Sequence, residues 1–205
     1  MDRKYLVKQG SLTDGDELVL VNAANTNVAL GSGVSGAIRG ACGPGYQDRI
    51  FEQLNARYGG PMEPGHVLVT DAGAHPTARY VAHVAVMDYR QGFNSSSYPD
   101  PARIEACCRN LWTALEAIED EATLSVAMVG LGAGTGNLGA RIPTELACRT
   151  LQEHLERQPQ SRIERVVYYG FQLFEYMAML EVVSSFFEVP PETVPQEARK
   201  YLQRG

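Results

Sequence analysis

The chain has 205 residues, of which 24 are acidic and 18 basic, so its formal net charge is −6, and this acidic balance argues against nucleic acid as a partner. No apolar run approaches the roughly 18–20 residues that span a membrane, and the N-terminal residues lack the apolar core of a signal peptide. We therefore expect a cytoplasmic protein that has neither nucleic acid nor a membrane as its partner.

Strands and helices are predicted to alternate along the chain. Apolar runs and helical spacing predict, in chain order, strands at 4–8 and 18–21, helices at 34–42 and 44–58, strands at 66–70 and 79–86, a polar loop at 94–101, a helix at 104–120, a strand at 124–130, a helix at 143–155, a strand at 166–169 and a helix at 173–187. This order predicts an α/β fold with a mixed, mostly parallel sheet and helices on both faces. We expect one domain over residues 1–189 and a polar tail over residues 190–205 that is either loose or docked.

The cysteines and histidines predict no metal site. No two cysteines have CxxC spacing, Cys107 and Cys108 are adjacent, and no histidine lies near another histidine or a cysteine at ligand spacing. We expect free thiols that act as small apolar residues, and we expect the protein to need no cofactor.

Two glycine-rich loops, residues 31–33 and 132–136, carry the strongest functional signal. Each follows a predicted buried strand, and ligands of such sheets lie at the carboxyl ends of the strands. Glycine lets the backbone approach a ligand closely, and the helix that begins behind each loop favours an anion. Either loop alone could be only a tight turn, but together they predict a diphosphate ligand.

The chain lacks the Gly-Lys-Ser/Thr of a P-loop, but the dinucleotide pattern GxGxxG occurs twice. The first match joins Gly31, Gly33 and Gly36, and the second begins at Gly134. In a Rossmann fold the glycine turn follows its strand directly, and the first match does not. A Rossmann-type dinucleotide-binding protein is therefore the lesser alternative.

Residues 21–25 (VNAAN) and 31–38 (GSGVSGAI) together resemble the signature of the macrodomain family, whose members bind ADP-ribose and its conjugates. The resemblance continues through residues 65–73, 81–84 and 131–136, and covers roughly residues 4–187. It implies a three-layer α/β/α sandwich.

The resemblance also implies a role for each candidate site residue. Asn25 would bond the hydroxyls of the distal ribose with its amide, which both donates and accepts hydrogen bonds. Phe171 would pack on adenine, and Asn22 would fix its own turn through side-chain-to-backbone bonds. The remaining candidate ligand contacts are Ser11 at the adenine, Gly31, Ser32, Gly33 and Val34 around one phosphate and the distal ribose, and Gly132, Ala133, Gly134, Thr135 and Gly136 at the diphosphate.

The chain departs from the family pattern at three places. Ser11 stands where many members have an aspartate that bonds the adenine amino group, which puts selectivity for adenine in doubt. Ser35 and Arg39 stand where the hydrolase branch has an aspartate and a histidine with catalytic roles. Ser32 replaces the middle glycine of the family's triple.

The resemblance leaves two main functions open. The first is hydrolysis of ADP-ribose conjugates, either mono-ADP-ribosyl-protein or an ester or 1''-phosphate of ADP-ribose, with Asn25 orienting the ribose and Ser35 at most orienting a water. The second is a reader module that binds ADP-ribose without turnover, which the missing aspartate at position 35 favours. A chain that is one compact domain favours the enzyme. Asn25 and both glycine loops argue against a third possibility, a structural protein whose pocket no longer binds a ligand.

Overall fold

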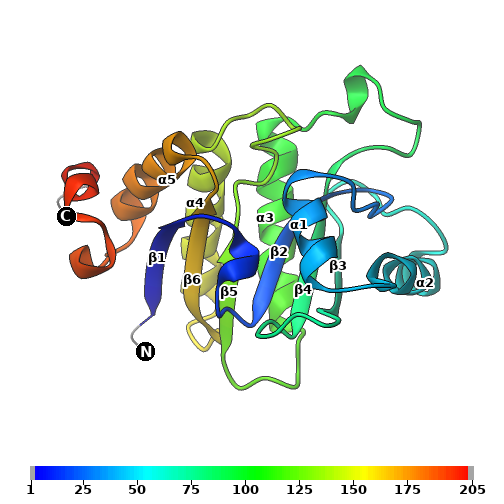
Figure 1. Ribbon diagram of the computed structural model, residues 1–205, viewed down its shortest axis with the longest axis horizontal. Coiled ribbons are helices and arrows are strands. Elements are labelled where there is room, and N and C mark those ends of the chain that lie inside the picture. The colour runs from blue at the N-terminus through cyan, green and yellow to red at the C-terminus, as the bar shows by residue number, and fades with distance from the viewer. Residues whose placement is uncertain (1–2, 203–205) are drawn as a thin grey trace.

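A six-stranded sheet lies between two layers of helices in the computed structural model, which describes residues 3–202 (Figure 1). The strands are β1 (Lys4–Gln9), β2 (Val19–Asn25), β3 (Val67–Asp71), β4 (Tyr80–Met87), β5 (Leu124–Met128) and β6 (Ile163–Gly170), in the spatial order β1-β6-β5-β2-β4-β3. Only the β3–β4 pair is antiparallel. The predicted mixed, mostly parallel sheet is therefore confirmed, and its order differs from the 3-2-1-4-5-6 order of a Rossmann fold.

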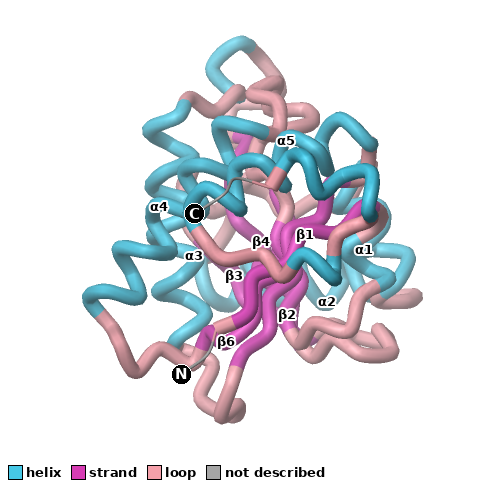
Figure 2. Tube along the Cα trace, turned by 90° about the vertical axis from the view of Figure 1, so that its left-hand side faces the viewer, coloured by secondary structure: helices cyan, strands magenta, loops and turns pink. Residues whose placement is uncertain are grey.

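Helices cover both faces of the sheet, as predicted. The helices α3 (Pro101–Glu116), α4 (Arg141–Arg157) and α5 (Leu173–Phe186) bury their apolar faces on one side, and α1 (Gly33–Ala41) and α2 (Tyr46–Tyr58) do so on the other. Figure 2 shows the strands between α3 and α4 on one side and α1 and α2 on the other. Within residues 3–202, none of the helices combines the length and hydropathy that crossing a bilayer requires.

The strand β2 shows why its sequence is a continuous apolar run. Successive side chains of a strand point to opposite faces, so Val19 and Val21 enter the core under α3 while Leu20 enters the core under α1 and α2. The strand continues to Asn25, whereas the sequence predicted an end at residue 21. It continues because Asn22 keeps its place in the parallel ladder opposite His83 of β4.

Several helix ends also differ from prediction. The helix α2 begins at Tyr46 and not at residue 44, because residues 43–46 form a turn in which the Tyr46 N–H donates to the Gly43 carbonyl. The helix α4 begins two residues before Pro143, which lies in the first turn, where its missing N–H is not needed. The helix α3 ends at Glu116 and not near residue 120.

The tail is docked as far as the structure describes it. Residues 190–202 form two short 3₁₀ helices, and Val194 and Ala198 are buried in the same core as α5. Figure 1 shows this segment folding back beside α5. Residues 203–205 of the predicted tail lie outside the described residues.

Candidate functional site

A pocket of about 430 Å³ opens where β1, β5 and β6 end and α1 begins. The carboxyl ends of these parallel strands share one edge of the sheet, so the segments that follow them meet there. The pocket is lined by Gly10, Ser11, Leu12, Gly33, Val34, Ala37, Val129, Gly130, Ala133, Gly134, Tyr169, Phe171, Gln172, Glu175 and Met179.

Six residues singled out from the sequence line this one pocket: Ser11, Gly33, Val34, Ala133, Gly134 and Phe171. The other candidates are not part of its lining: Asn22, Asn25, Gly31, Ser32, Ser35, Gly132, Thr135 and Gly136. Sequence reasoning missed the apolar residues Leu12, Val129 and Met179, which belong to three separate segments. It also missed the polar pair Gln172 and Glu175, because no local pattern shows that the start of α5 lies at the pocket.

The first glycine loop ends in the N-terminus of α1. Gly33 begins the helix with a left-handed φ of 57°, and an added Cβ there would meet no atom within 4 Å. The N–H groups of the first turn have no acceptor within the helix, and the Ser32 side chain does not cap them. These amides, together with the positive end of the helix, form a site suited to an anion.

The second glycine loop, residues 132–136, is folded back on itself and on Gly130. The Ala133 N–H donates to the Gly130 carbonyl at 3.0 Å, and the Leu138 N–H donates to the Gly132 carbonyl at 3.1 Å. An added Cβ at Gly136 would stand 2.5 Å from the same Gly132 oxygen, so this close turn requires glycine. Gly134, in contrast, borders open space on the pocket side.

Asn25 ends β2, and its side chain closes the turn that follows. Its Oδ1 accepts the N–H groups of Asn27 and Ala29 at 3.1 and 3.2 Å, and its Nδ2 donates to the Ala29 carbonyl at 3.0 Å. These bonds use both parts of the amide and leave one N–H of Nδ2 for another acceptor. The turn that leads to the first glycine loop therefore depends on Asn25.

A buried chain of polar side chains lies beneath α1. The Ser35 hydroxyl donates to Asn22 Oδ1 at 2.8 Å, Asn22 Nδ2 lies 3.0 Å from His83 Nδ1, and His83 Nε2 lies 3.1 Å from Thr70 Oγ1. Ser35 is thus directed into the interior. The Asn22 side chain bonds to two other side chains, Ser35 and His83, and does not make the bonds to the backbone of its own turn that the sequence predicted.

His83 is neutral in this chain of bonds. Burial lowers its pKa from 6.5 to about 3. The neutral ring accepts the Asn22 amide at Nδ1, so its proton is on Nε2, which donates to Thr70. The network therefore ties α1 to β2, β4 and β3.

One end of the pocket is walled by aromatic and apolar side chains. Phe171 follows β6 and is 67% exposed, whereas Leu12 and Met179 are buried beside it. The Tyr169 hydroxyl donates to the buried carboxylate of Glu17 at 2.8 Å, which holds the ring in place. Burial, together with that carboxylate, raises the pKa of Tyr169 well above its usual value, so the hydroxyl stays protonated.

Ser11 lies at this end, but its hydroxyl is used locally. It lies 2.7 Å from the Thr13 hydroxyl and accepts the Thr13 N–H at 3.3 Å, which caps the short helix η1 (Leu12–Asp14). The Gly10 N–H donates to the Gly170 carbonyl at 3.0 Å, so the segments after β1 and β6 lie side by side.

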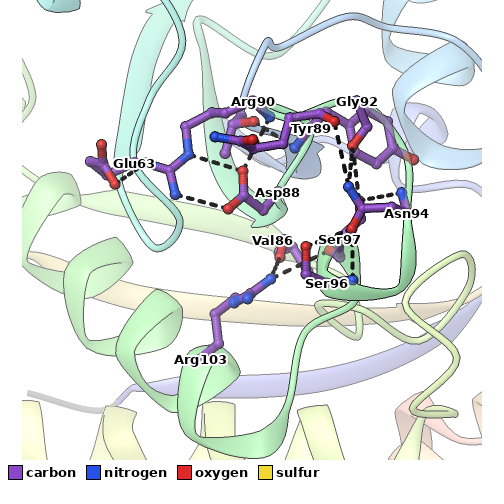
Figure 3. A network of polar contacts seen from close by, with 12 residues as sticks. Glu63, Val86, Asp88, Tyr89, Arg90, Gly92, Asn94, Ser96, Ser97 and Arg103 are labelled. Carbon is purple, nitrogen blue, oxygen red and sulfur yellow. Dashed lines mark hydrogen bonds and ion pairs between the residues drawn. The ribbon is translucent and has the colours of Figure 1, made fainter.

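The loop after β4, residues 88–99, is held by its own hydrogen bonds and by ion pairs. Figure 3 shows Arg90 between the carboxylates of Glu63 and Asp88, and the Asp88 N–H donates to the Ser97 carbonyl at 3.0 Å. The Tyr89 N–H donates to Thr26 Oγ1 at 2.9 Å, in the turn that Asn25 closes. At its other end, Pro99 Cγ lies 3.2 Å from where a Cβ on Gly132 would stand. The loop therefore packs against both the turn that Asn25 closes and the second glycine loop.

The family model for the Macro domain matches residues 21–147, which include most of β2, both glycine loops and the start of α4. The chain belongs to the macrodomain family. A relative from Cronobacter turicensis, named O-acetyl-ADP-ribose deacetylase, is 30% identical over 79% of this chain and 86% of that protein. A macro domain-containing protein of Listeria monocytogenes is 27% identical over 80% of this chain and 88% of that protein.

Solved macrodomain structures share the fold. A mutant of the Oceanobacillus iheyensis macrodomain with ADPR has a TM-score of 0.72 at 22% identity, covering 90% of this chain and 94% of that one. The Trypanosoma brucei macrodomain in complex with ADP-ribose has a TM-score of 0.68 at 23% identity, covering 85% of this chain and 67% of that one. The macrodomain fold predicted from residues 21–38 is therefore confirmed.

The thiols of this macrodomain are packing residues, as predicted. Cys42, Cys107, Cys108 and Cys148 are all buried and unpaired. Burial raises the pKa of Cys42 to about 11 and that of Cys107 to about 12. A thiolate nucleophile is therefore disfavoured at these positions.

The neutral His83 predicts a pH-dependent stability of the macrodomain. Between pH 6.5 and 3 the unfolded chain binds a proton at this histidine and the folded chain does not. Stability from this group is therefore complete above pH 6.5 and falls by up to about 1.4 kcal/mol for each pH unit below it. The free energy of unfolding, measured with denaturant at several pH values between 5 and 6.5, should change less steeply with pH for His83→Gln than for the wild type. Equal pH dependence of the two proteins, or an NMR titration of the His83 imidazole near pH 6.5 in the wild type, would contradict a buried neutral ring.

Proposed function

We propose that this macrodomain binds ADP-ribose in the pocket and hydrolyses ADP-ribose conjugates. The observation that carries the proposal is the pocket itself. Two glycine loops with open, amide-bearing surfaces meet at one side, and Phe171 with buried apolar residues forms the other. A diphosphate next to an aromatic base has this same division of charge and apolar surface. The deacetylase name of the 30% identical relative supports a hydrolytic reaction.

In this arrangement the diphosphate lies between the first turn of α1 and the second glycine loop. The adenine packs on Phe171, and the distal ribose extends toward the turn that Asn25 closes. The remaining N–H of Asn25 donates to a ribose hydroxyl, while the loop after β4 bounds the end that receives the attached group. Because no Lys or Arg is among the described residues that line the pocket, the anion is held by backbone amides and a helix dipole and not by basic side chains.

The proposed reaction is the addition of water to an ADP-ribose ester. The water oxygen attacks the ester carbonyl, the bond from that carbon to the ribose oxygen breaks, and a proton passes to the ribose oxygen. The products are ADP-ribose and a carboxylic acid. The chain accelerates the step by positioning, since bound diphosphate and ribose fix the ester relative to the water, and backbone amides nearby can stabilise the developing oxyanion.

The second candidate is a reader that binds ADP-ribose without turnover. One observation favours it: the Ser35 hydroxyl is bonded to Asn22 in the interior and offers no base to the pocket. Incubating the wild-type protein with a carboxylate-linked ADP-ribosylated protein distinguishes the two. Release of ADP-ribose supports the hydrolase, whereas tight binding without release supports the reader.

Calorimetric titration with ADP-ribose and AMP tests the binding proposal. We expect a micromolar dissociation constant for ADP-ribose and at least about tenfold weaker binding of AMP, because AMP lacks the second phosphate and the distal ribose and so loses charge-assisted hydrogen bonds. Equal affinities for the two ligands would contradict a site built around a diphosphate.

A further inference from the structure

Glu175 is the one acidic side chain among the described residues that line the pocket. It lies in the first turn of α5, next to Phe171 and Gln172 in the pocket wall. Its Oε2 accepts the backbone N–H of Gln172 at 2.8 Å. This bond fixes the carboxylate beside the aromatic end of the pocket, and the second oxygen, Oε1, remains to accept another donor.

The other polar side chains at this end are less suited to accept a hydrogen bond from a ligand. The Ser11 hydroxyl is used by Thr13. The Tyr169 hydroxyl is directed to Glu17, away from the pocket. Gln172 offers a neutral amide, whose hydrogen bonds are weaker than those of a carboxylate. A donor on a planar ring stacked on Phe171 therefore finds its strongest acceptor in Glu175.

We propose that Glu175 selects the nucleobase by accepting a hydrogen bond from its exocyclic amino group. The inference rests on the proposed binding of ADP-ribose and names the residue that makes this site specific for an amino-bearing base. A base without that amino group leaves the carboxylate oxygen without its donor inside a pocket that the ligand has partly closed to water. Sites built around such a bond discriminate against the analogue that lacks it.

The test compares ADP-ribose with the analogue that carries unsubstituted purine in place of adenine. Both ligands have the same diphosphate, riboses and ring shape. We expect the wild type to bind ADP-ribose about tenfold more tightly than the purine analogue, which is the loss of one charge-assisted hydrogen bond at a partly exposed site.

The variant Glu175→Gln should remove this preference. Glutamine keeps the helix cap, because either Glu or Gln at this position can accept the N-cap amide. Its single oxygen is then used by the Gln172 N–H, so its NH₂ group faces the base and offers no acceptor. We expect the two dissociation constants to agree within about twofold, with the affinity for the purine analogue itself little changed.

Gln172→Ala is the matched control: it removes the neighbouring polar side chain, including its own bond to the Glu175 backbone N–H, but keeps the Gln172 backbone N–H that holds the Glu175 carboxylate. Its preference for ADP-ribose should equal that of the wild type. Equal binding of both ligands by the wild type, or loss of the preference in Gln172→Ala but not in Glu175→Gln, overturns this inference and leaves the proposed function standing. Failure of the wild type to bind either ligand overturns both.

Discussion

Gly33→Glu should abolish ADP-ribose binding, lowering affinity by more than about 100-fold, while the protein remains folded. A side chain at Gly33 projects into open space at the pocket. A carboxylate there occupies the proposed phosphate site and places a negative charge against the ligand's own charges. The left-handed φ of Gly33 adds about 1–2 kcal/mol of strain, which a domain with a stability of about 5–15 kcal/mol tolerates. Calorimetry and thermal unfolding measure the two effects separately.

Two control variants separate charge from strain. Gly33→Ala has the same backbone strain without the charge, so it should lose stability but retain most binding. Gly40→Glu adds the same charge to the exposed, open face of α1 outside the pocket lining, so it should bind like the wild type. Full binding by a folded Gly33→Glu protein would show that the ligand lies elsewhere.

Asn25→Ala should reduce turnover of a carboxylate-linked ADP-ribose conjugate by about 100-fold. The substitution removes the hydrogen bonds that close the turn after β2 and, with them, the contact proposed for the distal ribose. Small misplacements of reacting atoms have effects of this size. Single-turnover kinetics with the conjugate measures the loss of turnover, and thermal unfolding of the same variant measures the separate effect of opening the turn.

Ser35→Ala is the comparison variant for this experiment. It leaves the Asn22 oxygen without its buried donor, so we expect about 1–3 kcal/mol of lost stability and a smaller loss of turnover than in Asn25→Ala. If Ser35→Ala removed turnover and Asn25→Ala did not, Ser35 would act directly on the reaction. If the wild type bound ADP-ribose without any turnover, the reader would be the correct function.

The local patterns of the sequence are sufficient for the fold and for the position of part of the candidate site. Glycine spacing and the VNAAN turn are short-range features, so both loops could be placed from residues 21–38 and 132–136 alone. The partnership of Asn22 with His83 could not, because it depends on the register between β2 and β4. The position of Glu175 at the pocket could not be predicted either, since it depends on the start of α5 packing at the ends of other strands.

The buried chain of polar side chains beneath α1 has a consequence for the free energy of ligand binding. Ser35 is anchored through Asn22 to His83 of β4, so the amides of the first turn are held in position before any ligand arrives. Binding then spends little conformational entropy on ordering this segment. Amide hydrogen exchange in α1 beyond its first turn should therefore be slow even in the free protein, and ligand should add little further protection there.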